Sequence, residues 1–286
     1  MTVPQQFRNL FEPIKIGTLT VKNRFVMPPM GTNLADPGGF VTDDMIAYYE
    51  AKGKGGAGLV IVEVTSVEYP RGSAVALQLA IDDDKYLPGL TALATAIKRG
   101  GARAAMQLVH AGGARRSIVP GMRSVAPSPI PRVGADIPEE LTVGQIRELV
   151  EKFARGAERA AKAGFDAIEL HAAHYYLMAQ FLSAEWNRRR DDYGGDLEHR
   201  ARFTLEVVRA IRGKLGRGFP LWARINGMEY GLEHGTTLEE GQLTARMLED
   251  AGTDAVDVSA CGRGPVHASA WPQGGRMLPP MAHPAG

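Results

Sequence analysis

Two hydrophobic patterns alternate along the chain. Short continuous apolar runs, typical of strands buried on both faces, are each separated from the next by a longer polar or amphipathic stretch. The predicted strands are residues 25–27, 58–63, 103–108, 167–171, 221–225 and 255–259. The predicted helices are residues 43–54, 87–99, 142–163, 198–215 and 238–251. This alternation favours a parallel sheet with helices packed outside it.

The ends of the predicted helices carry capping signals. Thr42 and Thr142 are suited to be N-caps, and Gln145 completes a capping box with Thr142. Glycines follow the helical stretches, as at Gly164 and Gly252. The phrases RAAKAGFDAIEL and RMLEDAGTDAVDV repeat the same order of helix, Ala-Gly and strand. This repeat supports a barrel, although a doubly wound sheet uses the same unit.

Composition narrows the class of protein. The chain has 286 residues, a net charge of +1, 44% hydrophobic residues and 23% charged residues. This balance gives no reason to expect a nucleic-acid or membrane-surface partner. Cys261 is the only cysteine, which excludes an internal disulfide and a cysteine-ligated iron–sulfur cluster within the chain. Without a leader-like start or a long apolar segment, we expect a cytoplasmic protein.

A long stretch rich in Gly, Pro and Arg separates Val109 from Leu141. Loops of this length inside compact domains are usually functional. In a barrel it would follow the third strand at the C-terminal face, where active sites are built.

The segment with the most chemical potential starts at the end of the fourth predicted strand. His171 ends that strand, and His174 and Tyr176 follow. Imidazole N–H groups can hold a developing oxyanion, and a phenol can donate a proton. A pair of structural histidines is the competing interpretation. A two-histidine metal site is disfavoured, because no carboxylate stands beside the pair at helical spacing, and no metal ligands are predicted.

Several segments, in order, resemble the old yellow enzyme family of NADH:flavin oxidoreductases, especially its bacterial 2,4-dienoyl-CoA and enoate reductase branch. The resemblance covers residues 8–262. The segments that carry it are Lys22 to Met30, Gln107-Leu108-x-His110, His171-x-x-His174-x-Tyr176, Gln180-Phe181-Leu182-Ser183, Asn187-x-Arg189-x-Asp191-x-Tyr193-Gly194-Gly195 and Arg224-Ile225-Asn226.

The resemblance implies an α/β fold, a (β/α)8 TIM barrel with FMN at its C-terminal mouth. Residues 1–286 would form one FMN-binding TIM-barrel domain, incomplete at the C-terminus. After Ser259 nothing resembles the family's seventh and eighth strands and their phosphate site, so we expect a barrel truncated after strand 6. A fragment, completion by another chain, a homo-oligomer and further C-terminal domains in a longer parent all remain open.

The resemblance also implies which residues contact the flavin. The backbone of one segment would lie against the isoalloxazine, and Val64 would touch the ring. Gln107 would bond the pyrimidine edge, where a carboxamide suits the N3–H and a carbonyl. Arg224 would stand near N1 and O2 and stabilise the anionic reduced flavin. The backbone segment consists of Pro28, Pro29, Met30 and Gly31.

The implied reaction is reduction, or in reverse formation, of a C=C bond conjugated to a carbonyl or thioester. His171 and His174 would grip the carbonyl, hydride would come from flavin N5, and Tyr176 would protonate the α-carbon. NADH or NADPH is the expected electron donor, and a small enone, enoate or enoyl-CoA the substrate. Arg115, Arg116 and Arg123 could meet a CoA phosphate or form a solvated basic loop.

Two other functions stay open. The first is an amine dehydrogenase or N-demethylase on the same fold. The second is a non-catalytic truncated fragment. An aldolase-type barrel is set aside because no predicted strand ends in lysine.

Two departures from the family pattern concern the site: Gly31 lacks the Thr or Cys side chain of several members, and Gly113 stands in place of a usual arginine.

Overall fold

A six-stranded parallel sheet organises the molecule, a computed structural model that describes residues 5–114, 121–132 and 136–262. Every neighbouring pair of strands runs parallel, in the order β10-β9-β8-β5-β4-β3. The six described strands form a half-barrel, in agreement with the predicted relation to a TIM barrel. Its strands are β3 (Val26–Met27), β4 (Leu59–Ser66), β5 (Arg103–Val109), β8 (Ala167–Ala172), β9 (Leu221–Tyr230) and β10 (Ala255–Gly262).

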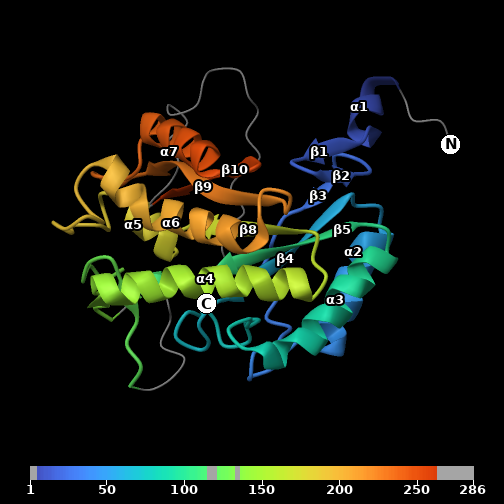
Figure 1. Cartoon of the computed structure of the whole chain (residues 1–286), viewed down its shortest axis with the longest axis horizontal. Helices are drawn as coiled ribbons and strands as arrows, with labels where there is room; N and C mark the ends of the chain where they lie inside the picture. Colours follow the sequence, from blue (N-terminus) through green and yellow to red (C-terminus); the bar gives the residue numbers. More distant parts are fainter. Residues whose placement is uncertain (1–4, 115–120, 133–135, 263–286) are drawn as a thin grey trace.

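Five helices follow successive strands and cover one face of the sheet. Neighbouring helices pack on one another, and the buried apolar cluster between them and the sheet includes Phe153, Phe203 and Leu90. In Figure 1, α4 crosses the front of the sheet with α2 and α3 beside one of its ends. The helices are α2 (Asp43–Lys54), α3 (Leu87–Arg99), α4 (Val143–Lys162), α6 (Leu197–Leu215) and α7 (Leu238–Ala251).

The capping signals act as predicted. Thr42 accepts a hydrogen bond from the N–H of Met45 at the start of α2. Thr142 and Gln145 form the expected capping box of α4, and Thr237 forms a second one at α7. Because each box satisfies otherwise unpaired backbone N–H groups, it fixes where the helix begins.

The inner face of the sheet has a second, smaller apolar cluster. It joins Leu59, Ile61 and Trp222 with Leu19 and Val21. The last two come from a two-stranded antiparallel hairpin, β1 (Ile14–Ile16) and β2 (Leu19–Val21). A Cβ at the hairpin's Gly17 would meet the side chain of Asp254, just before β10. The hairpin therefore covers the inner face near the N-terminal ends of the strands and leaves the C-terminal ends for polar residues.

Several short elements depart from the sequence prediction. The stretch from Val109 to Leu141 contains the short helix η3 (Gly112–Ala114) and a small parallel sheet of β6 (Val125–Ala126) and β7 (Glu139–Glu140). The hairpin, α1 (Arg8–Phe11) and α5 (Leu177–Leu182) were not predicted. Such elements are too short to show a hydrophobic period, so pairing partners distant in sequence decide them.

Candidate active site

The three residues predicted to be catalytic lie together at the carboxyl end of β8. The rings of His171 and His174 are 5.2 Å apart between centroids, at 90° to one another. The rings of His171 and Tyr176 are 4.6 Å apart. His171 is buried, whereas His174 and Tyr176 are partly exposed. Two imidazoles and a phenol thus border one space at the carboxyl end of the strand.

The turn that brings these side chains together has an unusual backbone. His174 has φ 55° and Tyr175 has φ 66°, in the left-handed region that non-glycine residues rarely adopt. The backbone N–H of His174 donates to Oδ1 of Asn226 at 3.1 Å, and its Nε2 lies 2.6 Å from Oγ of Ser259. Strands β9 and β10 therefore hold a turn that would otherwise be unfavourable.

Hydrogen bonding and burial define the protonation state and the tautomer of His171. Its Nδ1 accepts from the N–H of Ala173 at 3.3 Å, which assigns the proton of the neutral ring to Nε2. Burial, followed by the nearby His174 and Arg224, lowers the pKa of His171 well below its ordinary value. His171 is therefore a neutral imidazole with one N–H to donate.

A buried carboxylate links three strands beside this turn. Glu169 is fully buried and accepts from Nε2 of Gln107 and from Nε1 of Trp222, both at 2.6 Å. Strand register places the three side by side on β5, β8 and β9. Burial is the main cause that raises the pKa of Glu169 to about 7, against the hydrogen bond from Trp222. Oε1 of Gln107 is buried and has no hydrogen-bond partner.

Arg224 lies next along the inner face. It is paired in register with His171 on β8 and with Asp257 on β10. Its Nε is 3.3 Å from Oδ2 of Asp257, but this contact is not aligned as a hydrogen bond and the N–H is buried. Arg224 therefore adds positive charge with an unused donor to the same strand ends.

The loop after β3 brings the remaining predicted residues to β4. A Cβ built on Gly31 would be 3.7 Å from Cγ2 of Val64, so these two positions face each other. The N–H of Thr32 donates to Oε2 of Glu63 at 2.9 Å, which anchors the loop on β4. Within the preceding segment Pro29 is buried, whereas Pro28 and Met30 are exposed.

These groups fit the polar edge of an isoalloxazine. The ring system offers one N–H and two carbonyl oxygens along its pyrimidine edge, and the strand ends offer an unused buried acceptor on Gln107 and an unused buried donor on Arg224. Buried polar atoms are rarely left without partners. A bound flavin would satisfy both at once, so the donor set suits the cofactor that the resemblance implies.

A second buried network joins the loops after β5 and β8. Gln180, on α5, accepts from the N–H of Gly113 at 3.0 Å and donates to the carbonyl of Tyr175 at 2.6 Å. His110 accepts from the N–H of Gly112 at 3.1 Å, so its Nε2 donates to Glu68 at 2.9 Å. The bonds of Gln180 therefore tie the loop after β5 to the histidine turn.

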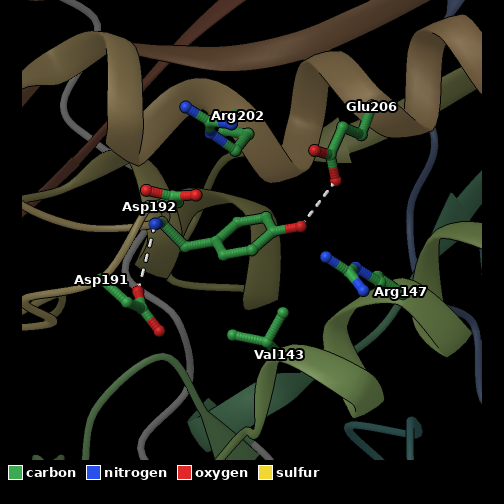
Figure 2. A pocket seen from close by; sticks show the side chains of 7 residues that line it. Val143, Arg147, Asp191, Asp192, Arg202 and Glu206 are labelled. Atoms are coloured by element: carbon green, nitrogen blue, oxygen red, sulfur yellow. Dashed lines mark hydrogen bonds between the residues drawn. The ribbon is translucent and has the colours of Figure 1, made fainter.

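Asn187 to Gly195 form a loop held by its own residues. Arg189 and Asp191 make a bidentate ion pair, and Nδ2 of Asn187 donates to the carbonyl of Tyr193 at 2.7 Å. A cavity of about 530 Å³ lies beside this loop (Figure 2). The hydroxyl of Tyr193 donates to Glu206. None of the predicted site residues lines this cavity.

Several residues that shape the site were not predicted. Glu169 and Ser259 bond the predicted residues Gln107 and His174 directly, whereas Trp222 bonds Glu169 and Gln180 bonds the carbonyl of Tyr175. Of these four residues, only Glu169 could have been found from the sequence, because a charged residue inside an apolar strand is rarely buried without a role.

Among the described residues, no cluster of His, Cys, Asp or Glu is arranged to hold a metal ion. Arg115 and Arg116 lie outside the described residues.

The sequence matches the NADH:flavin oxidoreductase / NADH oxidase family over residues 9–270. The chain belongs to this family. The resemblance to old yellow enzymes is therefore confirmed, and with it the relation of the half-barrel to the family's TIM barrels. No helix within the described residues is long and apolar enough to cross a membrane.

Three relatives place this flavin oxidoreductase family member more closely. It is 48% identical to an NADH oxidase of Thermoanaerobacter brockii over 89% of this chain and 39% of that protein. The structure of 2-naphthoyl-CoA reductase with 2-naphthoyl-CoA matches with a TM-score of 0.85 at 31% identity, over 90% of this chain and 41% of that one. Morphinone reductase matches with a TM-score of 0.81 at 30% identity, over 87% and 73%. The chain thus spans about two fifths of the NADH oxidase's length.

Proposed function

We propose that this chain carries the catalytic face of an FMN-dependent ene-reductase that takes electrons from NADH or NADPH. The observation that carries the proposal is the cluster of His171, His174 and Tyr176 at the end of β8, beside the unused polar atoms of Gln107 and Arg224. Family membership supports a flavin and a nicotinamide donor. The 2-naphthoyl-CoA bound by a structural relative supports a conjugated thioester among the substrate classes.

The histidine turn is suited to bind a carbonyl oxygen. His171 offers an N–H while neutral, and Ser259 holds the ring of His174 in place. Hydrogen bonds to that oxygen would draw electron density from the conjugated double bond and make its β-carbon electrophilic. The positive charge of Arg224 beside the pair disfavours a protonated amine. These features favour an enone, enoate or enoyl thioester over the substrate of an amine dehydrogenase.

The other groups have distinct tasks. Bound FMN would supply the hydride for the β-carbon. Gln107 and Arg224 would hold the polar edge of the ring, and the loop containing Pro28, Pro29, Met30 and Gly31 would lie against it with Val64. Tyr176 would deliver its phenolic proton to the α-carbon, completing addition of a hydride and a proton across the bond.

The test is the visible spectrum of the purified chain, followed by analysis of the supernatant after heat denaturation. We expect a flavin spectrum and released FMN. Anaerobic reduction with NADPH and then addition of 2-cyclohexenone should reoxidise the flavin and yield cyclohexanone. A chain that remains colourless after incubation with FMN would contradict the proposal and favour the non-catalytic fragment. A chain that binds FMN but turns over only amines would favour the dehydrogenase.

A further inference from the structure

Glu169 bonds Gln107, the residue proposed to bind the polar edge of the flavin. Its two carboxylate oxygens are both used, one by Nε2 of Gln107 and one by Nε1 of Trp222, each at 2.6 Å. The indole N–H of Trp222 can only donate, so it always requires an acceptor on Glu169. The remaining oxygen of Glu169 is thus committed to Gln107.

This commitment fixes which end of the Gln107 carboxamide meets Glu169. An ionised carboxylate accepts hydrogen bonds and cannot donate, so the NH2 group of Gln107 must face it. The oxygen of Gln107 then points elsewhere, and it is the buried atom left without a partner. A carboxamide turned by 180° would place two oxygens against each other.

We propose that Glu169 is a positioning residue that selects the orientation of the Gln107 carboxamide, and so presents an acceptor oxygen to the N–H of the flavin pyrimidine edge. The proposal rests on the flavin site proposed above and adds a residue to it. Glu169 needs no contact with the cofactor, because it acts through the amide of Gln107 and uses Trp222 as its fixed reference.

The charges around Glu169 make this orientation depend on pH. Arg224 on β9 favours the carboxylate, whereas Asp257 on β10 disfavours it, and the β5 residue that bonds it, Gln107, is neutral. His171, two residues along β8, is neutral. Burial raises the pKa of Glu169 to about 7. A protonated Glu169 would donate its O–H to Gln107 on β5, and the Gln107 oxygen would turn towards Glu169 to accept it. Gln107 therefore presents its oxygen to the flavin only when Glu169 is ionised.

Glu169→Gln tests the orientation with almost no change in shape. The new carboxamide must turn its oxygen to Trp222, which leaves its NH2 facing Gln107. Gln107 then has to present its oxygen to position 169 and its NH2 to the flavin. The NH2 of Gln107 would then face the N–H of the flavin pyrimidine edge. We therefore expect FMN to bind at least about tenfold more weakly, the scale of one buried unmatched polar group.

Trp222→Phe supplies the matched rescue. Phenylalanine has no N–H, so the oxygen of a glutamine at position 169 becomes available to Gln107. In the Glu169→Gln/Trp222→Phe double variant, most of the lost FMN affinity should return. Trp222→Phe alone should bind FMN within about threefold of the wild-type chain, since an ionised Glu169 still orients Gln107. A general loss of packing would instead make the double variant worse than either single variant.

The apoprotein gives a readout that does not need the cofactor. In ¹H–¹⁵N spectra of the full chain, the side-chain amide of Gln107 and the indole N–H of Trp222 should shift together with a midpoint near pH 7, and both should stay constant in Glu169→Gln. Gln107→Leu identifies the amide signal. A wild-type chain that binds no FMN would contradict the proposed function, while this titration still decides the orientation.

Two results would overturn the inference. The first is FMN affinity of Glu169→Gln within about twofold of the wild type, or a double variant no tighter than that single variant. The second is a wild-type spectrum in which the Gln107 amide does not respond when the Trp222 indole titrates.

Discussion

At the scale of single residues, the chemistry of the site depends on partners that lie far away in sequence. Ser259 is 85 residues from His174, and Asn226 is 52 residues from it. The sequence could indicate His171, His174 and Tyr176, because a strand end followed by such residues is typical of active sites. It could not indicate what orients them, since those hydrogen bonds exist only after β9 and β10 pair beside β8.

The proposed proton donor is tested by Tyr176→Phe. Removing the hydroxyl should leave FMN binding and its reduction by NADPH near wild type, because only protonation of the α-carbon loses its donor. Turnover of 2-cyclohexenone should fall by about 10²-fold or more, the usual contribution of general acid catalysis. Stopped-flow reduction and steady-state turnover separate the two steps. Tyr193→Phe, away from the strand ends, is the control and should retain turnover; equal losses in both variants would contradict the role.

Ser259→Ala tests the proposed oxygen-binding role of His174. Loss of the 2.6 Å contact to Nε2 should let the ring rotate and weaken the grip on the carbonyl. We expect KM for the enone to rise by about threefold to tenfold, the scale of one hydrogen bond, with a smaller change in kcat. Ser259→Thr keeps the hydroxyl and should restore KM. A reduced kcat with unchanged KM would argue that His174 does not bind the substrate.

At the scale of elements, helix ends were easier to predict than strand ends. The helices at residues 43–54, 87–99 and 238–251 have the predicted bounds, because caps and terminal glycines are local signals. β9 runs five residues further than predicted, to Tyr230 rather than residue 225. Its extension mixes polar and apolar residues and pairs with β10 past an irregularity in register, which no local pattern reveals.

The two capping boxes allow a direct measure of this local information. Thr142→Ala should lower the free energy of unfolding by about 1 kcal/mol, because the N–H of Gln145 loses its acceptor at the start of α4. Thr237→Ala should cost a similar amount at α7. Urea titrations followed by circular dichroism measure both. Arg155→Ala, which removes an exposed ion pair with Glu151, should change it by less than about 0.5 kcal/mol. A Thr142→Ala loss no larger than this control would contradict the capping argument.

At the scale of the whole molecule, a partly buried carboxylate, that of Glu68 after β4, joins the segment after β5 to α4. Glu68 accepts from His110, after β5, and from Nζ of Lys152, on α4, at 2.6 Å. Burial raises the pKa of Glu68, but the hydrogen bonds and charges of these partners outweigh it and hold the pKa at about 2. A carboxyl whose pKa is lower when folded stabilises the fold above its ordinary pKa and loses that contribution as pH falls.

The comparison of wild type with Glu68→Gln isolates this effect. The stability advantage of the wild type should be constant above about pH 5 and shrink as pH falls from about 4.5 towards 2. Unfolding midpoints in urea across this range provide the measurement. Glu151→Gln, on the exposed side of α4, should show a weaker dependence because solvent screens its partners. An advantage for Glu68 that grows as pH falls would have the wrong sign for the proposed contact.

The two outer strands of the half-barrel, β3 and β10, have open edges that affect how chains associate. Within the described residues, β10 pairs only with β9 and β3 only with β4, so both outer strands offer unpaired backbone groups. Apolar side chains accompany them: Val258 on β10 is 64% exposed and Val26 on β3 is 46% exposed. Open parallel edges of this kind promote association between chains.

We therefore expect the purified chain to self-associate with increasing concentration, and Val258→Lys to reduce this association. A lysine at the border keeps strand propensity low and adds a charge that repels a second edge. Multi-angle light scattering of the apoprotein over a range of concentrations measures the effect. Leu238→Lys is the matched control: Leu238 is 53% exposed but begins α7, away from both borders, and should leave the mass distribution unchanged. Equal effects of the two substitutions would mean that general surface hydrophobicity, not the strand edge, drives association.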